Sequence, residues 1–306
     1  MTGQTTARNA LTGRLKYEAF AVAARIVPWL PIRLSYALAD VAGVVAWTLT
    51  PRPRANVIDN LRHVLGPLAT TGLLYSHTHS VYRNVARYYI DLLRLPRLDL
   101  RRFEREKLLD YGYAYLTEAV AEGRGVIVVT AHYGSPDLTI QAAGVRGLQF
   151  LVLTEPLDPP ELAKLYLRLR ASHGQRFLPV GTEALKETLR TLRRGGIVLL
   201  AVDRDIQGTG VEVPFFGAMA RLPAGAVDLA KRTGAPIVPA FSRRLAGGAI
   251  ELTIEPRVRL VETGDRDRDR RTNVQRVISR CERHLRQDPG QWLVLERIWP
   301  KPFPPP

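Results

Sequence analysis

Apolar residues recur at helical spacing through most of the first 122 residues. This pattern predicts helices over residues 15–26, 32–49, 56–65, 73–93 and 111–121. Pro51 and Pro53 interrupt the series after the second helix, and Gly123 follows the last one. We therefore expect residues 1–122 to form a helical N-terminal region that packs on a core.

From residue 123 onward the pattern changes to short β-branched runs, which are typical of buried strands. Such runs cover residues 125–131, 148–153, 197–202, 237–241 and 250–254. Stretches with helical periodicity lie between several of them, at residues 138–143, 161–172, 183–193 and 224–232. Strands that alternate with helices predict an α/β fold, with a mixed sheet flanked by helices in residues 123–306. We expect the two regions to form a single structural unit.

The apolar stretch near the N-terminus indicates contact with a membrane surface. Residues 1–10 are polar and lack the pattern of a signal peptide. Charges and prolines interrupt residues 17–50, whereas a spanning helix needs roughly 20 consecutive apolar residues. Residues 35–49 fit a helix that lies in the membrane interface, and a buried core helix is the alternative. Aromatic and basic residues suited to the headgroup level accompany it: Trp29, Tyr36, Trp47, Arg52 and Arg54.

The net charge of this 306-residue chain, +15, points to an anionic partner. Nucleic acid, anionic lipid headgroups and a phosphorylated carrier all satisfy that requirement, and a coding bias toward arginine explains the same excess without any partner. We expect no nucleic acid, because neither a recognition motif nor an aromatic, basic stacking surface is present in the sequence. Cys281 is the only cysteine, so no intrachain disulfide forms, which suits a reducing compartment.

The turn after the first predicted strand is the candidate catalytic segment. His132 stands where that strand ends, and Ser135 followed by Pro136 predicts a helix start. Asp137 then lies in the first helical turn, where its side chain and that of His132 can meet. A carboxylate bonded to one ring nitrogen fixes the tautomer and leaves the other nitrogen to take a proton from a substrate hydroxyl. The alternatives are a structural histidine and an aspartate stabilised only by the helix dipole.

Several short motifs in a fixed order resemble those of one known family. They are NVIDNLRH at 56–63, His132 with Asp137 after four intervening residues, RASHG at 170–174, DRDIQG at 203–208, VPFFG at 213–217, LPAG at 222–225, TGAP at 233–236 and PGQW at 289–292. Together they resemble the bacterial lipid A biosynthesis (lauroyl/myristoyl) acyltransferase family, and most of all its phosphatidylinositol mannoside acyltransferase branch. The chain departs from that pattern at Ser135 and Pro136, where the family often has Asn-Trp. This departure concerns the acceptor more than the reaction.

The resemblance implies a glycerolipid acyltransferase-like fold and transfer of a fatty acyl group from acyl-CoA or an acyl-carrier protein. The acceptor would be a hydroxyl of a glycolipid or phospholipid such as a phosphatidylinositol mannoside. The resemblance makes His132 the general base and Asp137 its partner. It also implies peripheral attachment to the cytoplasmic face of the cell membrane, with membrane lipids and the acyl thioester as partners. No metal and no tightly bound cofactor are expected.

Further polar residues are candidates for substrate binding: Glu155, Arg170, Asp203, Arg204 and Glu212. Glu155 follows the second predicted strand, and Asp203 and Arg204 follow another, so they face the sheet edge where α/β proteins bind ligands. By position Glu155 resembles the acidic residue near the catalytic histidine of the mannoside branch, where it would assist that histidine or bind the acceptor's sugar. Arg170 is suited to a phosphate or a glycan hydroxyl, or else is a solvated helix residue. Glu212 is expected to shape a loop, and an internal salt bridge is the alternative role of Asp203.

Other functions fit parts of the sequence. The triplet Asp203-Arg204-Asp205 offers two carboxylates for a divalent metal, as in a metal-dependent glycosyltransferase that uses a sugar nucleotide. A non-enzymatic protein that docks on a membrane through its N-terminal helices leaves the turn at His132 unexplained. Thioester hydrolysis, in which water replaces the acceptor, would use the same residues as acyl transfer.

Overall fold

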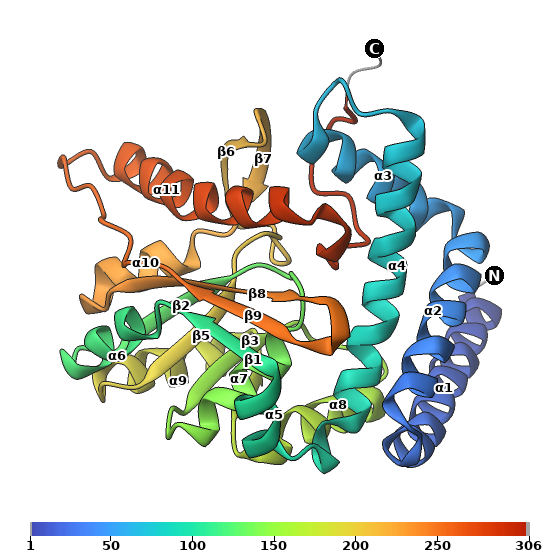
Figure 1. Ribbon diagram of the computed structural model, residues 1–306. Helices are drawn as coiled ribbons and strands as arrows, with labels where there is room; N and C mark the ends of the chain where they lie inside the picture. The colour runs from blue at the N-terminus through green and yellow to red at the C-terminus, as the bar shows by residue number, and fades with distance from the viewer. Residues whose placement is uncertain (1, 304–306) are drawn as a thin grey trace.

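The computed structural model describes residues 2–303, with side chains from residue 13 onward. The expected N-terminal region (1–122) and core (123–306) therefore extend beyond the described residues at Met1 and at 304–306. A central sheet carries helices on both faces, and a group of long helices stands at one end of it (Figure 1). The α-helices are α1 Thr2–Ile26, α2 Ile32–Leu49, α3 Pro51–Leu65, α4 Thr71–Arg94, α5 Leu100–Lys107, α6 Tyr113–Ala121, α7 Pro136–Val145, α8 Pro160–Arg170, α9 Thr182–Arg193, α10 Gly225–Thr233 and α11 Arg266–Gln287. Short 3₁₀ turns are η1 Val27–Trp29, η2 Leu95–Arg97, η3 Ala171–His173, η4 Ala246–Gly248 and η5 Pro289–Gln291.

The strands form one mixed sheet and one separate hairpin. They are β1 Leu108–Tyr111, β2 Val126–Thr130, β3 Phe150–Thr154, β4 Arg176–Pro179, β5 Ile197–Ala201, β6 Val211–Phe215, β7 Ala218–Leu222, β8 Ile237–Arg244 and β9 Ile250–Ile254. The order in the sheet is β1-β9-β8-β2-β5-β3-β4, and β6 pairs only with β7. The five strands from β8 to β4 run parallel, whereas β9 is antiparallel to β8. The predicted fold class, a mixed sheet flanked by helices, is confirmed.

The centre of the sheet is covered on both faces. Every residue of β2 is buried, as expected for a β-branched run in a parallel sheet. Successive side chains point to opposite faces, so Ile127 and Val129 pack in the core layer that contains α9, α10 and α11. Val126 and Val128 pack in the other layer, which contains α6 and α7. Apolar side chains fill both faces of the sheet, so polar side chains gather at the carboxyl edge of the parallel strands.

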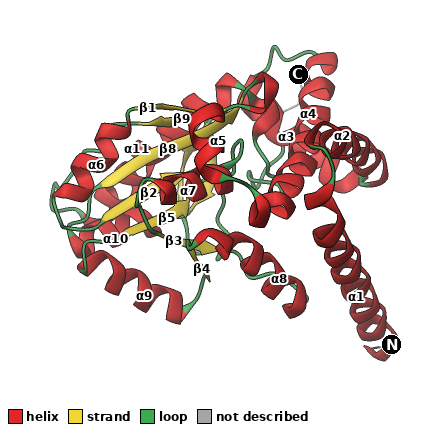
Figure 2. Cartoon of the chain, turned by 60° about the horizontal axis from the view of Figure 1, so that its bottom comes forward, coloured by secondary structure: helices red, strands yellow, loops and turns green. Residues whose placement is uncertain are grey.

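The N-terminal helices pack around α4, which runs past the end of the sheet (Figure 1). Helix α2 contacts α4 through a stripe of small residues, Ser35, Ala39 and Gly43. The approach is close, since a Cβ atom at Gly43 would lie 2.9 Å from the Cα of Arg83. Figure 2 shows α1 extending away from the body of the molecule.

The opposite face of α2 is apolar and exposed. Its large exposed side chains are Ile32, Leu34, Leu38, Val41, Val44, Val45 and Leu49. Among the helices that the structure describes, α2 alone has the length and composition of a membrane span, with a mean hydropathy of 1.3 over 18 residues. Such a helix near the N-terminus is weak evidence for a span, and only 17% of it is buried in the fold.

Two of the aromatic residues expected at a headgroup level face the protein instead. The hydroxyl of Tyr36 donates a hydrogen bond to Asp91 at 2.7 Å, inside the contact between α2 and α4. Trp47 stacks on His79 with ring centroids 4.0 Å apart, and its indole nitrogen is buried. Both expectations were wrong because a 3.6-residue repeat turns these side chains toward α4. Trp29 is 69% exposed, as a headgroup residue would be.

Candidate active site

The carboxyl ends of two neighbouring parallel strands bring His132 and Asp203 together. His132 follows β2 and Asp203 follows β5, and these strands pair in register from Val126 with Ile197 to Thr130 with Ala201. The Nδ1 atom of His132 lies 2.9 Å from Oδ1 of Asp203, and the backbone N–H of His132 donates to Oδ2 at 3.1 Å. Asp203 is fully buried, whereas the His132 side chain is 34% exposed. The histidine is therefore fixed through Nδ1, and Nε2 is left for a substrate.

The segment PGQW near the C-terminus completes the support of this pair. The indole N–H of Trp292 donates to Oδ2 of Asp203 at 2.7 Å, and the backbone N–H of Leu293 donates to the carbonyl of His132 at 2.7 Å. Burial by itself raises the pKa of the Asp203 carboxyl, but the attraction of His132 and the hydrogen bonds from His132 and Trp292 outweigh it and lower the pKa below its usual value. Asp203 thus stays ionised beside the ring.

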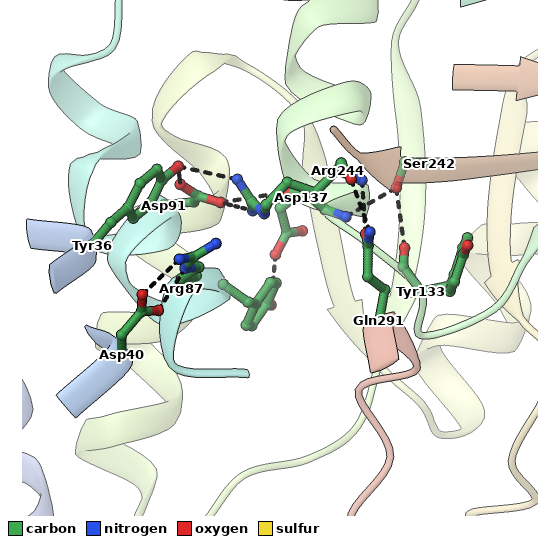
Figure 3. Close-up of polar contacts among 11 residues, drawn as sticks. Tyr36, Asp40, Arg87, Asp91, Tyr133, Asp137, Ser242, Arg244 and Gln291 are labelled. Carbon is green, nitrogen blue, oxygen red and sulfur yellow. Dashed lines mark hydrogen bonds and ion pairs between the residues drawn. The ribbon is translucent and has the colours of Figure 1, made fainter. Parts of the chain in front are cut away.

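Asp137, the partner expected for His132, bonds other residues. Its Oδ2 atom accepts hydrogen bonds from the Tyr88 hydroxyl at 2.6 Å and from Nε of Arg170 at 3.0 Å. The first turn of α7 directs the carboxylate toward α4 and α8, and not back over the end of β2 (Figure 3). The expected pairing was wrong because helix geometry, and not sequence distance, sets the direction of this side chain.

Arg170 is held inside the protein by the same contacts. Its side chain also donates to the Tyr88 hydroxyl at 2.6 Å and lies over the ring of Tyr166, 4.6 Å from the ring centroid. Burial alone lowers the pKa of an arginine, but here the negative charge of Asp137 and the hydrogen bond to Tyr88 raise it, so the group keeps its charge. Arg170 is therefore not a solvated helix residue. Among the described residues, its side chain forms no hydrogen bond or ion pair with His132.

Ser135 occupies the predicted N-cap position of α7, with Pro136 in the first helical turn. Its side chain does not cap the helix, however, but donates to Asp91 at 3.2 Å. Asp91 is the centre of a buried cluster in which it also accepts from Tyr36 and forms an ion pair with Arg244 (Figure 3). Removing one member of a buried ion pair costs about 3–5 kcal/mol, so this cluster strongly fixes the start of α7.

The turn between His132 and Ser135 is fixed from two further sides. Ser242 donates to the carbonyl of Tyr133 at 3.1 Å (Figure 3). The N–H of Gly134 donates to the carbonyl of Gln291 at 3.1 Å. Gly134 has φ of 68°, and a Cβ atom there would lie 2.0 Å from the carbonyl oxygen of Ser242. Only glycine fits this position. The turn is therefore held from several sides, which fixes the orientation in which it presents His132.

A second polar cluster lies at the same sheet edge. Arg204 follows Asp203 and forms ion pairs with Glu155, which follows β3, and with Glu296 at 2.8 Å. The Arg204 side chain is 16% exposed, and those of Glu155 and Glu296 are 40% and 61% exposed. Burial alone lowers the pKa of Arg204, but the charges of Glu296 and Glu155 raise it. The structure thus brings Glu155, Asp203 and Arg204 to one edge, as expected, and adds Glu296.

Glu212 and Asp205 lie apart from these clusters. Glu212 is on β6, is 63% exposed and faces Arg221 across the hairpin at 3.7 Å. Asp205 accepts a hydrogen bond from the N–H of Gly210 at 2.8 Å and so closes its own loop. The two carboxylates of the Asp203-Arg204-Asp205 triplet therefore have separate partners. Within residues 13–303, no three His, Cys, Asp or Glu side chains are grouped as metal ligands would be.

Comparison with known proteins agrees with the motifs found in the sequence. Residues 9–301 match the family described as bacterial lipid A biosynthesis acyltransferase. A phosphatidylinositol mannoside acyltransferase of Mycobacterium tuberculosis (strain ATCC 25618 / H37Rv) is 34% identical over 191 residues, which are 59% of this chain and 58% of that protein. The protein of the same name from Mycolicibacterium smegmatis (strain ATCC 700084 / mc(2)155) is 30% identical over 225 residues, 70% of this chain and 69% of its own length. The chain thus spans less than two thirds of the M. tuberculosis relative.

Proposed function

Because the chain belongs to the bacterial lipid A biosynthesis acyltransferase family, we propose that it transfers a fatty acyl group from an acyl thioester to a hydroxyl of a membrane glycolipid. The observation that carries this proposal is the half-exposed His132, bonded through Nδ1 to the buried carboxylate of Asp203. The donor is acyl-CoA or an acyl-carrier protein. The names of the mycobacterial relatives support a phosphatidylinositol mannoside as acceptor.

The proposed reaction is direct transfer by general-base catalysis. Nε2 of His132 takes the proton of the acceptor hydroxyl while its oxygen attacks the thioester carbonyl carbon. The tetrahedral intermediate then breaks its C–S bond, the thiolate leaves, and the imidazolium returns the proton to the sulfur. Asp203 stabilises the imidazolium and holds the ring in the required tautomer. No metal and no bound cofactor take part in this scheme.

Asp137 and Arg170 have a structural role in this proposal. Their ion pair, with Tyr88, connects the first turn of α7 to α4 and α8. They keep the catalytic turn in place without touching the reacting atoms. Glu155 and Arg204 lie at the sheet edge beside the dyad and are proposed to contact the substrate, whereas the position of Glu212 favours a role in the β6–β7 hairpin alone.

The two rival functions account for fewer of the contacts. A glycosyltransferase site built on Asp203 and Asp205 would require both carboxylates to face one metal ion, but Asp203 faces His132 and Trp292. A protein that only binds membranes has no use for a buried carboxylate that orients a half-exposed histidine. Thioester hydrolysis remains a side reaction of the proposed mechanism, with water in place of the acceptor.

The proposed function is tested by incubating the protein with radiolabelled palmitoyl-CoA, or palmitoyl-acyl-carrier protein, and purified phosphatidylinositol mannoside. We expect labelled glycolipid to form, at a rate that EDTA does not change. Free labelled fatty acid as the sole product would identify a thioesterase. Activity that requires a divalent metal and a sugar nucleotide would reject the proposal in favour of a glycosyltransferase.

We further propose that the protein binds the cytoplasmic face of the membrane peripherally through the exposed apolar face of α2. Val41 is 63% exposed on this face, so Val41→Asp is expected to weaken binding to vesicles of phosphatidylcholine and phosphatidylglycerol about tenfold or more. Co-sedimentation measures the bound fraction. Leu185→Asp, at a 48% exposed apolar residue of α9, is the matched control and should bind as the wild type does. Equal binding of all three proteins would contradict a role of α2.

A further inference from the structure

Arg204 lies between two exposed carboxylates beside the His132–Asp203 pair. Glu155 contacts it from the end of β3, and Glu296 contacts it from the segment that follows η5. The backbone connects this cluster to the dyad at two points. Asp203 directly precedes Arg204, and the N–H of Leu293, three residues before Glu296, donates to the His132 carbonyl at 2.7 Å. The cluster and the proposed general base therefore lie at the same edge of the sheet.

The backbone around Glu296 is held by two amide side chains of α3. Asn60, which is 1% exposed, donates to the carbonyl of Glu296 at 2.8 Å and accepts from the N–H of Ile298 at 3.2 Å. Asn56 donates to the carbonyl of Leu295 at 3.3 Å. These are the asparagines of the NVIDNLRH motif. The backbone is thus fixed on both sides of a glutamate whose side chain is 61% exposed.

Stability alone does not explain this arrangement. An ion pair with a mostly exposed partner contributes about 0–1 kcal/mol, and Arg204 already has Glu155 as a counterion. A carboxylate held on a fixed backbone at the edge of a site is what ligand recognition requires.

The charge of the cluster selects the chemical class of the ligand. Two carboxylates outnumber one guanidinium, so the cluster is negative although the whole chain carries +15. A phosphate would be repelled here. Carboxylate oxygens accept hydrogen bonds from hydroxyl groups, and guanidinium N–H groups donate to hydroxyl oxygens. Adjacent hydroxyls on an uncharged ring satisfy both kinds of partner at once.

We propose that Glu296, together with Glu155 and Arg204, binds the vicinal hydroxyls of a neutral sugar ring in the acceptor and so determines which hydroxyl reaches His132. This inference rests on the proposed acyltransferase function and names the part of the acceptor that the site recognises. Glu296 is the specificity-determining residue of this subsite, because its position is fixed by α3 and its carboxylate is the most exposed of the three groups.

Steady-state kinetics with palmitoyl-CoA and phosphatidylinositol mannoside test the subsite. Glu296→Gln keeps the size of the side chain but removes its charge, and should raise the acceptor KM about tenfold or more, since charge-assisted hydrogen bonds to the sugar are lost. The donor KM in the same variant should stay near the wild-type value. Glu296→Asp should recover part of the acceptor affinity, and Glu262→Gln, at an exposed glutamate elsewhere, is the matched control. An unchanged acceptor KM, or a rise shared equally by the donor, overturns the proposal.

A binding measurement separates this inference from the catalytic proposal. Isothermal titration calorimetry with the deacylated headgroup, a glycerophosphoinositol mannoside, requires no turnover. We expect Glu296→Gln to bind it about tenfold or more weakly than the wild type, and inorganic phosphate not to compete. Equal headgroup affinity of the two proteins, or competition by phosphate, overturns the sugar subsite. Failure of the wild type to transfer palmitate while headgroup binding still depends on Glu296 would reject the acyltransferase function alone.

Discussion

Replacing His132 by alanine is expected to lower the rate of acyl transfer by about 10²–10⁴-fold, the range that general bases contribute. Without the imidazole, the acceptor hydroxyl must attack the thioester while still protonated. The fold should tolerate the change, because the side chain is 34% exposed and Asp203 keeps the hydrogen bonds from Trp292 and from the backbone N–H at position 132. Initial rates of labelled glycolipid formation at saturating substrates measure the effect.

The matched control is His77→Ala. His77 lies on α4, and no hydrogen bond of its side chain is found among the described residues. We expect this variant to transfer the acyl group at the wild-type rate. If His132→Ala, with an unchanged Tm, kept its rate within a few-fold of wild type, His132 would not be the base.

Much of the fold could be predicted because its central strands and helices have clear hydrophobic patterns in the sequence. The runs that predicted β2, β5 and β9 agree with the strands to within one or two residues, and the predicted boundaries of α2 are those observed. Elements with weak local signals were missed. Strand β4 has only four residues and ends in a proline. Strand β1 was not predicted either, and its last residue, Tyr111, was assigned to the helix that follows it. Their strand structure depends on pairing with distant segments, which local patterns do not reveal.

The long helix α11 was also missed, although a signal for it exists. Its buried residues, Val274, Val277, Ile278, Cys281 and Leu285, follow helical spacing. The remainder of the helix is strongly polar, so that the apolar stripe is narrow. Acids and bases alternate at its start, where Asp265 is the N-cap and accepts a hydrogen bond from the N–H of Arg268 at 3.0 Å.

The location of the candidate site was easier to predict than its contacts. Parallel strands place their carboxyl ends at one edge, which was sufficient to group His132, Glu155 and Asp203. The strand order was not predicted, so the adjacency of β2 and β5, which gives His132 its partner, could not be foreseen. Trp292 and Glu296 reach the site through a loop after α11 that has no repeating pattern. Only the PGQW motif gave a sequence signal for that loop.

Replacing Asp203 by asparagine is the second change with a large expected effect. The amide keeps the size of the side chain but cannot stabilise the imidazolium, and its N–H can hold the ring in the wrong tautomer. In serine proteases the equivalent substitution lowers the rate about 10⁴-fold, and we expect a loss of at least about 10²-fold here. The fold is expected to persist, since the amide oxygen can still accept from Trp292.

Asp137→Asn provides the contrast. Asp137 is buried against Arg170, with N–O separation of 3.0 Å, so the amide leaves the arginine without its counterion. Breaking such a pair costs about 3–5 kcal/mol of folding free energy. We therefore expect a lowered Tm, and a transfer rate per folded molecule within about tenfold of wild type, because Asp137 does not touch His132.

The most direct test of the His132–Asp203 dyad is the initial rate of acyl transfer by Asp203→Asn and Asp137→Asn, measured side by side and divided by the folded fraction from circular dichroism. We expect Asp203→Asn to be folded and nearly inactive, and Asp137→Asn to be less stable but active once folded. The opposite order, with folded Asp137→Asn inactive and Asp203→Asn active, would contradict the dyad and return Asp137 to the role of partner of His132.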